Sequence, residues 1–231
     1  MSLERTVAFL MAYDGSAFRG WQKQPGMATV QGALEDALRA FLGKRYAVHG
    51  AARTDAGVHA LGQVASIRCG RDADFAYLQL PEALRLLRWA EADPSFHARS
   101  SSVGKRYRYQ LGQLVQRAAD WGRARAALRG LEGLPELPGL GSPAKDHKPA
   151  PPLAKWELSD AGVLELEARA FRKHQVRNIA GHLAAVALGH TAPESLRELA
   201  QRKRPWMGAR APASGLTLVE VLYPPGIDPF R

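Results

Sequence analysis

The order of hydrophobic and polar residues predicts strands separated by a few helices. Residues 3–13 form a nearly continuous apolar run, which is typical of a buried strand. After Thr29, apolar residues recur three and four positions apart through residue 42, and Gly43 follows them. This pattern predicts a helix over 30–42 that Thr29 caps and Gly43 ends.

The remaining periodic segments alternate between the two kinds of element. Strands are predicted over 46–51, 61–69, 105–111, 153–159, 163–170 and 215–223, helices over 120–131, 173–188 and 193–202, and either element over 81–92. The turn residues Asp160-Ala161-Gly162 indicate that two of these strands form a hairpin. Antiparallel strand pairs with helices between them indicate an α+β fold.

A proline-rich connection divides the pattern into two parts. Residues 132–152 contain six prolines and three glycines, which predicts an irregular and mobile segment. We therefore expect an N-terminal α+β subdomain over 1–111 and a C-terminal α+β subdomain over 112–231 that contains this connection.

Composition excludes several classes of protein. Of the 231 residues, 46% are hydrophobic and 23% are charged, which is ordinary for a globular protein and excludes a disordered tail, a collagen-like fibre and a disulfide scaffold. The single cysteine, Cys69, cannot form an intrachain disulfide. No apolar run approaches the roughly 20 residues that span a bilayer, and no signal-peptide pattern precedes the first strand. We expect a cytoplasmic protein.

The charge is uneven along the chain. The formal net charge is +10; residues 1–98 hold 11 basic and 10 acidic side chains, whereas residues 99–231 hold 21 and 12. The basic residues gather in 99–129, 169–177 and 202–204. These clusters either line one groove that follows a phosphate backbone or form separate solvated faces, and the sequence leaves both open. A net positive charge of this size favours a polyanionic partner, with nucleic acid as the first candidate.

One loop places a carboxylate among small residues. Residues 53–60 read Arg-Thr-Asp-Ala-Gly-Val-His-Ala, and Gly57 lets the backbone turn sharply beside Asp55. Arg53 lies two residues before Asp55, within reach of a nearby anion. Such an Asp either takes part in catalysis or caps its own turn, and the local sequence does not decide between them.

Two further segments combine cations with aromatic or apolar residues. On a helix, His174 and Arg177 lie three positions apart, where Arg177 can pair with a carboxylate of another element and hold it ionised. In 105–109, Tyr107 and Tyr109 alternate with arginines. This suits either base stacking beside phosphate contacts or a half-buried strand with a solvated Arg face.

Other catalytic motifs are missing. The sequence contains no phosphate-binding Walker loop, no dinucleotide-binding glycine motif and no Gly-x-Ser-x-Gly elbow. His174, His182 and His190 follow one another at eight-residue intervals, which is not a metal-ligand spacing. We therefore expect no metal site, and the motifs for nucleotide hydrolysis, dinucleotide redox chemistry and serine-triad hydrolysis are missing.

Taken in order, these segments resemble the tRNA pseudouridine synthase A family. The matching motifs are Tyr13-Asp14-Gly15-Ser16, Gly20-Trp21-Gln22, Val30-Gln31, Arg53-Thr54-Asp55-Ala56-Gly57-Val58-His59, Phe96-His97-Ala98-Arg99, Lys105-Arg106-Tyr107-Arg108-Tyr109, 171–179, Gly215-Leu216 and Tyr223-Pro224. The resemblance implies two similar α/β subdomains that share a mostly antiparallel sheet, with a basic cleft between them.

The resemblance also implies an activity and a role for each site residue. The substrate would be uridine at positions 38, 39 and 40 in the tRNA anticodon arm, converted to pseudouridine by a homodimer that needs no cofactor or metal. Asp55 would be the nucleophile and Arg177 its ion-pair partner. Tyr107 would stack on the target uracil, and Arg53 would stabilise the flipped-out nucleotide.

The chain departs from the family in two segments. Residues 132–152 are short and contain no Phe, and the Asn-rich stretch of the family is reduced at 77–81. Two alternatives therefore stay open: a synthase that acts on other tRNA or ribosomal RNA uridines, and a non-catalytic basic RNA-binding protein. Whether Asp55 attacks the ribose or the base is also open.

Overall fold

The computed structural model describes residues 4–70, 73–115, 119–142, 150–202, 206 and 208–231. The chain divides into two compact units: unit 1 comprises Met1–Val103 and Leu218–Arg231, and unit 2 comprises Gly104–Thr217. Strand β8 (Leu216–Leu222) begins in unit 2 and ends in unit 1. How the chain divides into independently folding domains stays a prediction.

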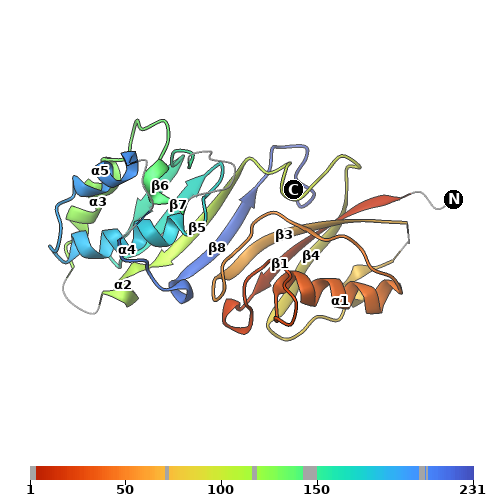
Figure 1. The fold of residues 1–231 in the computed structure, drawn as a ribbon. Coiled ribbons are helices and arrows are strands. Elements are labelled where there is room, and N and C mark those ends of the chain that lie inside the picture. Colours follow the sequence, from red (N-terminus) through yellow and green to blue (C-terminus); the bar gives the residue numbers. More distant parts are fainter. Residues whose placement is uncertain (1–3, 71–72, 116–118, 143–149, 203–205, 207) are drawn as a thin grey trace. The chain divides into compact units, whose positions relative to one another are not determined.

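Unit 1 is built on antiparallel strands (Figure 1). β1 (Arg5–Tyr13) pairs antiparallel with β3 (His59–Cys69) on one side and with β4 (Leu84–Ala92) on the other. The short strand β2 (His49–Gly50) also pairs with β3. Since most side chains of β1 and β3 are buried, these two strands carry the core of the unit.

One long helix completes the core of unit 1. α1 (Val30–Leu42) begins at Thr29, whose hydroxyl accepts the Gly32 N–H at 3.3 Å, and it ends at Gly43, as the pattern predicted. Phe41 of α1 lies against Phe75 with ring centroids 5.7 Å apart, and Phe75 meets Phe9 of β1 edge to face at 5.1 Å. These aromatic contacts connect the helix to the sheet.

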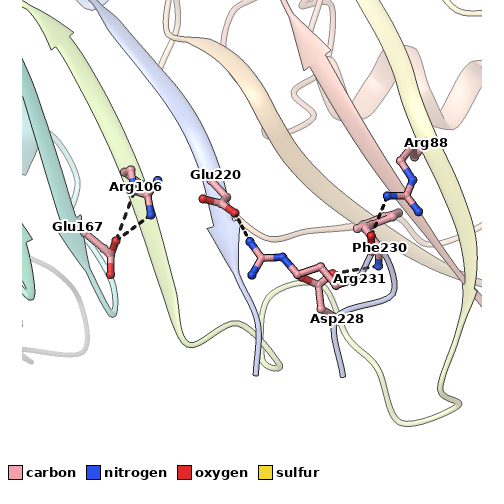
Figure 2. A network of polar contacts seen from close by, with 7 residues as sticks. All are labelled: Arg88, Arg106, Glu167, Glu220, Asp228, Phe230 and Arg231. Carbon is pink, nitrogen blue, oxygen red and sulfur yellow. Dashed lines mark hydrogen bonds and ion pairs between the residues drawn. The ribbon is translucent and has the colours of Figure 1, made fainter. Parts of the chain in front are cut away.

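The C-terminal residues are fixed to unit 1 by polar contacts (Figure 2). The guanidinium of Arg231 lies 2.8 Å from Glu220 of β8 and 3.5 Å from Asp228. Arg88 of β4 donates to the Phe230 carbonyl at 2.7 Å and also lies over its ring. The end of the chain is therefore held against both strands.

Unit 2 combines three antiparallel strands with helices. β5 (Gly104–Gln110) and β6 (Lys155–Leu158) pair antiparallel with β7 (Val163–Ala168). The helices are α2 (Leu111–Leu114), α3 (Trp121–Arg129), α4 (Gln175–Ala187) and α5 (Ser195–Gln201) (Figure 1). α4 buries the apolar face that its spacing predicted.

Short 3-10 turns occur at four places in the two units: Gly15–Ala17, Phe75–Tyr77, Pro138–Leu140 and Ala213–Gly215. The predicted α+β class with mostly antiparallel strands is confirmed. The ambiguous segment 81–92 forms strand β4. No helix among the described residues is long and apolar enough to cross a membrane.

The strand predicted over 46–51 is wrong in extent, because only His49 and Gly50 pair with β3. The backbone N–H and C=O of Ala52 bond to the side chain of Gln63 in place of a neighbouring strand. The ring of Trp21 fills the space beside Gly50, where a Cβ atom would lie 2.2 Å from it. The Ala51 N–H still donates to the Val64 carbonyl of β3 at 2.8 Å, and the Gln63 side chain takes the place of a strand partner only at Ala52, just beyond the predicted strand.

The described part of 132–152 is irregular, as predicted, but it is packed. Leu137 and Leu140 are fully buried, and the Leu137 N–H donates to the Ala150 carbonyl at 2.8 Å. The buried amide of Asn178 in α4 donates to the Leu140 carbonyl at 2.8 Å. Buried leucines and α4 therefore hold these residues in place, and the mobility of the segment stays a prediction.

Candidate active site

Asp55 lies in unit 1, in the loop between β2 and β3. The Val58 N–H donates to the Asp55 carbonyl at 3.2 Å, which closes a tight turn. Gly57 occupies the third position of this turn with φ +80°, a conformation that favours glycine. Asp55 is half-buried and Arg53 is exposed. The turn therefore leaves the Asp55 carboxylate within reach of solvent.

The residue before Asp55 belongs to a buried polar network. The hydroxyls of Thr54 and Tyr13 lie 2.7 Å apart, and the Gln63 amide donates to the Tyr13 oxygen at 3.3 Å. The same amide group donates to the Ala52 carbonyl at 2.8 Å and accepts the Ala52 N–H at 3.2 Å. Buried side chains of β1 and β3 therefore hold the loop in place through hydrogen bonds.

The segment after β1 packs directly on the loop. The Trp21 N–H donates to the Thr54 carbonyl at 3.0 Å, and the Trp21 ring is buried. At Gly20, φ is +91°, and a Cβ atom would lie 2.8 Å from the Thr54 carbonyl oxygen. On the far side, the Gly15 N–H donates to His59 Nδ1 at 3.3 Å. These contacts hold the backbone on both sides of Asp55.

Tyr107 lies on β5 in unit 2 with its side chain inward. The ring meets Phe171 edge to face, with centroids 5.2 Å apart and an interplanar angle of 87°. Tyr109 lies on the same face, and its hydroxyl donates to the Pro212 carbonyl at 2.9 Å. The alternation along β5 therefore separates tyrosines from arginines, as the period-two pattern predicted.

The arginines on the other face of β5 are paired with carboxylates of β7. Arg106 lies opposite Glu167 with a nitrogen 3.3 Å from its carboxylate (Figure 2), and Arg108 lies opposite Glu165 at 2.7 Å. Cross-strand pairs of opposite charge stabilise a sheet. These two cations are therefore largely neutralised within unit 2, and the solvated Arg face that the sequence left open is an ion-paired face.

Arg177 lies in the first turn of α4 and is half-buried. Its Nε donates to the Ala211 carbonyl at 2.8 Å, and the Ala211 N–H donates back to the Arg177 carbonyl at 3.0 Å. Burial raises the pKa of the Tyr109 hydroxyl, and the Arg177 charge partly offsets that rise. The backbone of Ala211 therefore orients the Nε edge of the Arg177 guanidinium.

His174 lies before α4 and not within it. It has φ +66°, and its Nδ1 lies 2.8 Å from the Ser142 hydroxyl. The expected i, i+3 helical pair of His174 and Arg177 is therefore wrong. His174 instead caps the entry to the helix with a left-handed backbone, a conformation uncommon for residues other than glycine.

The predicted site residues fall into two sets. Arg53 and Asp55 share one loop of unit 1, and Tyr107 and Arg177 come from two elements of unit 2. The pairing of Asp55 with Arg177, the basic cleft and the role of each residue stay predictions. Among the described residues, no group of three or more His, Cys, Asp or Glu side chains is arranged to hold a metal ion.

The basic cluster of 99–129 is largely used inside the protein. Besides the two ion pairs on β5, Arg125 pairs with Asp160, and Arg123 donates to the carbonyls of Val186 and Thr191. Arg117, Lys203 and Arg204 lie outside the described residues. Four of the arginines in this cluster therefore have partners within unit 2, while the net charge of the chain stays positive.

The sequence analysis missed Tyr13, Thr54 and Gln63 as parts of the site. Gln63 is fully buried in β3, where the neighbouring residues are apolar. A polar side chain inside an apolar strand needs hydrogen-bond partners, and this was the available signal.

Comparison with known proteins gives the family. The family model described as tRNA pseudouridine synthase matches residues 10–84 and 132–224. The chain belongs to the tRNA pseudouridine synthase family. It is 37% identical to tRNA pseudouridine synthase A of Chloroflexus aurantiacus, over 96% of this chain and 90% of that protein. It is 35% identical to the proteins of the same name from Coxiella burnetii (95% and 93%) and Methylocella silvestris (93% and 96%).

Two of the three candidate site segments lie in matched regions. The first matched region includes the loop of Asp55 and the network of Tyr13 and Gln63 around it, and the second includes Arg177. Tyr107 lies between the two matched regions. The resemblance stated from the motifs is therefore confirmed at the level of the tRNA pseudouridine synthase family.

Proposed function

We propose that this protein converts uridine to pseudouridine at positions 38, 39 and 40 of the tRNA anticodon stem-loop, with Asp55 as the nucleophile. The observation that carries the proposal is the Asp55 loop. The half-buried Asp55 lies in a turn whose flanks are fixed by buried side chains and by glycine contacts, in a chain that belongs to the tRNA pseudouridine synthase family.

The reaction is an isomerisation within one nucleotide. The N1–C1′ bond breaks, a C1′–C5 bond forms, C5 loses its proton and N1 gains one, so that no net oxidation or energy input is needed. An ionised Asp55 serves either by adding to the ribose or the base or by stabilising positive charge at C1′. A fixed carboxylate is an advantage in each case, because its position relative to C1′ decides the rate.

Arg177 is proposed to keep Asp55 ionised and in place. A carboxylate beside a guanidinium has a lowered pKa, since the cation favours its charged form. The bond from Arg177 Nε to the Ala211 carbonyl supports this role, because it fixes the orientation of the guanidinium plane, and a guanidinium in a fixed plane can pair bidentately with a carboxylate.

Tyr107 and Arg53 are proposed to handle the extruded nucleotide. The target base must leave its stack before C5 can reach C1′, and an aromatic side chain that stacks on the uracil stabilises the extruded state. Tyr107 has a ring already oriented by Phe171, and Arg53 is exposed beside Asp55 and suited to a phosphate.

The remaining parts of the proposal concern partners and place. The RNA partner is the tRNA anticodon arm, the protein acts as a homodimer in the cytoplasm, and the reaction proceeds without a cofactor. The charge of +10 supports an RNA partner, because cations that neutralise phosphates release counterions.

The proposal is tested with unmodified tRNA transcripts that carry uridine singly at position 38, 39 or 40. The wild-type protein should form pseudouridine at each position, and Asp55→Ala should form none while its tRNA affinity stays within about threefold, since the carboxylate acts mainly after binding. Pseudouridine only at other positions would contradict the substrate assignment. Activity retained in Asp55→Ala would contradict the role of the nucleophile.

A further inference from the structure

We propose that Tyr13 and Gln63, acting through Thr54, are positioning residues that fix the Asp55 backbone for catalysis. Tyr13, Thr54 and Gln63 together form a buried polar triad. The inference rests on the proposed function, since it concerns the residue that would attack the nucleotide. It adds residues of β1 and β3 to the residues that determine the rate.

Gln63 forms the base of the buried polar triad. Its Oε1 accepts the backbone N–H groups of Ala52 and Val64, each at 3.2 Å. Since an amide oxygen accepts and an amide nitrogen donates, these two N–H donors fix the orientation of the side chain. Its Nε2 therefore donates to the Ala52 carbonyl at 2.8 Å and to the Tyr13 oxygen at 3.3 Å.

Tyr13 carries the contact from Gln63 to the loop. Because the Tyr13 oxygen accepts from Gln63, its own proton can be donated to Thr54 Oγ1, 2.7 Å away. Burial raises the pKa of Tyr13 to about 12, so the hydroxyl keeps its proton at physiological pH. The ring of Tyr13 also meets Phe18 edge to face at 6.3 Å, which limits its movement.

Thr54 transfers this constraint to Asp55. Its hydroxyl is held by Tyr13 from one side, and its carbonyl accepts the Trp21 N–H at 3.0 Å from another. That carbonyl belongs to the peptide group that joins Thr54 to Asp55, and the planar peptide bond leaves little freedom at the Asp55 nitrogen. On the other side of Asp55, its carbonyl is closed into the turn by Val58.

The buried polar triad therefore determines the position of the Asp55 backbone, from which the carboxylate extends. Removing one hydroxyl from it leaves the loop in place but allows it to shift, because a buried polar atom loses its partner. A displacement of about 1 Å at a reacting group costs on the order of 100-fold in rate. The expected defect is thus in turnover and not in tRNA binding.

The test compares two tyrosines of unit 1 that lose the same atom. Tyr13→Phe removes the hydroxyl of the buried polar triad. Tyr223→Phe is the matched control, because Tyr223 is similarly buried (7% exposed against 5%) and its hydroxyl donates at 2.6 Å to Ala98, outside the Asp55 loop. Single-turnover rates and tRNA dissociation constants are measured for both variants and for the wild type.

We expect Tyr13→Phe to lower the single-turnover rate roughly 10- to 100-fold with a tRNA dissociation constant within about twofold of wild type. Tyr223→Phe should keep the wild-type rate even if its melting temperature falls as much as that of Tyr13→Phe. Equal rates in the two variants would overturn the inference, and so would a Tyr13→Phe defect in tRNA affinity alone. A wild-type protein without activity would overturn the proposed function, and with it the positioning role.

Two further measurements separate positioning from general stability. Thr54→Val also removes one hydroxyl, and the double variant Tyr13→Phe/Thr54→Val should be no slower than the worse single variant, because both changes break one contact. Amide hydrogen exchange in 53–59 should accelerate in Tyr13→Phe and stay unchanged in Tyr223→Phe. Additive rate losses, or an unchanged exchange rate in Tyr13→Phe, would contradict the role of the buried polar triad whatever the activity.

Discussion

Gly20 lies so close to Thr54 that a Cβ atom on residue 20 would come within 2.8 Å of the Thr54 carbonyl oxygen. The same atom would lie 3.1 Å from the Ala56 nitrogen. The segment after β1 therefore packs on the Asp55 loop through backbone alone. Since backbone atoms at both places cannot move aside cheaply, the position of the loop depends on the absence of a side chain at residue 20.

This relationship predicts a difference between two glycines of one segment. Gly20 and Gly26 both have positive φ, of +91° and +70°, but a Cβ atom on Gly26 would meet nothing within 4 Å. Gly26→Ala should cost about 1–2 kcal/mol of unfolding free energy from its backbone conformation alone and keep full turnover. Gly20→Ala should lose more stability and most of its activity. The measurements are denaturant unfolding and single-turnover rates, and equal behaviour of the two variants would refute the close packing.

Arg177→Lys should reduce activity although the charge is kept. Lysine cannot donate to the Ala211 carbonyl as Arg177 Nε does and also present the planar pair of donors that the proposed ion pair requires. We expect turnover to fall at least about 10-fold with tRNA affinity nearly unchanged. Arg210→Lys, which changes an arginine bonded to Asn178 at 3.3 Å in the same segment, is the control. Comparable turnover in both variants would speak against an ion pair of Arg177 with Asp55.

The salt dependence of tRNA binding should distinguish exposed from paired arginines. Arg108 already faces Glu165 at 2.7 Å, so Arg108→Gln should leave the slope of log K against log salt almost unchanged. Arg53 is exposed, and Arg53→Gln should flatten that slope by about one unit if it neutralises a phosphate. Binding titrations between low and physiological salt measure both slopes. A large change for Arg108 with none for Arg53 would reverse the assignment.

Stability should fall as the pH decreases through the range in which His97 titrates. Burial lowers the pKa of His97 below its ordinary 6.5, and the nearby His49, Arg99 and Arg68 lower it further. The unfolded chain therefore takes up the proton first, so unfolding is favoured as the pH falls from about 6.5 toward the lowered pKa of the folded state. Below the folded-state pKa, His97 is protonated in both the folded and the unfolded chain, and it no longer makes stability depend on pH.

The His97→Asn variant tests this pH dependence. His97 Nδ1 accepts the backbone N–H groups of Arg99 at 3.1 Å and Ser100 at 3.3 Å, and an Asn side-chain oxygen can accept from the same backbone without titrating. The melting temperature of the variant should depend less on pH between 7.5 and 5.5 than that of the wild type. Parallel pH curves would show that another group controls the loss.

The sequence predicted most elements because their signals are local. Thr29 and Gly43 mark the two ends of α1, and the alternation in β5 identifies its buried face. The contacts of Gly50 and Ala52 could not be predicted in this way. They involve the Trp21 ring beside Gly50 and Gln63, eleven residues from Ala52, which are tertiary contacts without a local pattern.

In the candidate site, too, some features have a local sequence signal and others depend on tertiary contacts. The loop of Asp55 could be singled out from its small residues, but the local sequence left catalysis and turn capping open, and only the resemblance to the family implied a catalytic role. The buried polar triad could not be singled out, because Tyr13 and Gln63 meet only when β1 pairs with β3. The pattern of charged residues was misleading for a related reason. In the sequence, Arg106 and Arg108 belong to a basic cluster, and only the pairing of β5 with β7 places carboxylates beside them.

The central claim is that the Asp55 carboxylate is needed for the C–C bond to form. When C1′ joins C5, the hydrogen on C5 must leave, so tRNA labelled with tritium at C5 of uridine reports the reaction directly. Wild-type protein should release tritium in proportion to the uridines at 38, 39 and 40. Asp55→Asn keeps the size of the side chain and one acceptor oxygen but replaces the charged carboxylate by a neutral amide, and it should bind the tRNA and release no tritium. Release at the wild-type rate by Asp55→Asn would contradict the account.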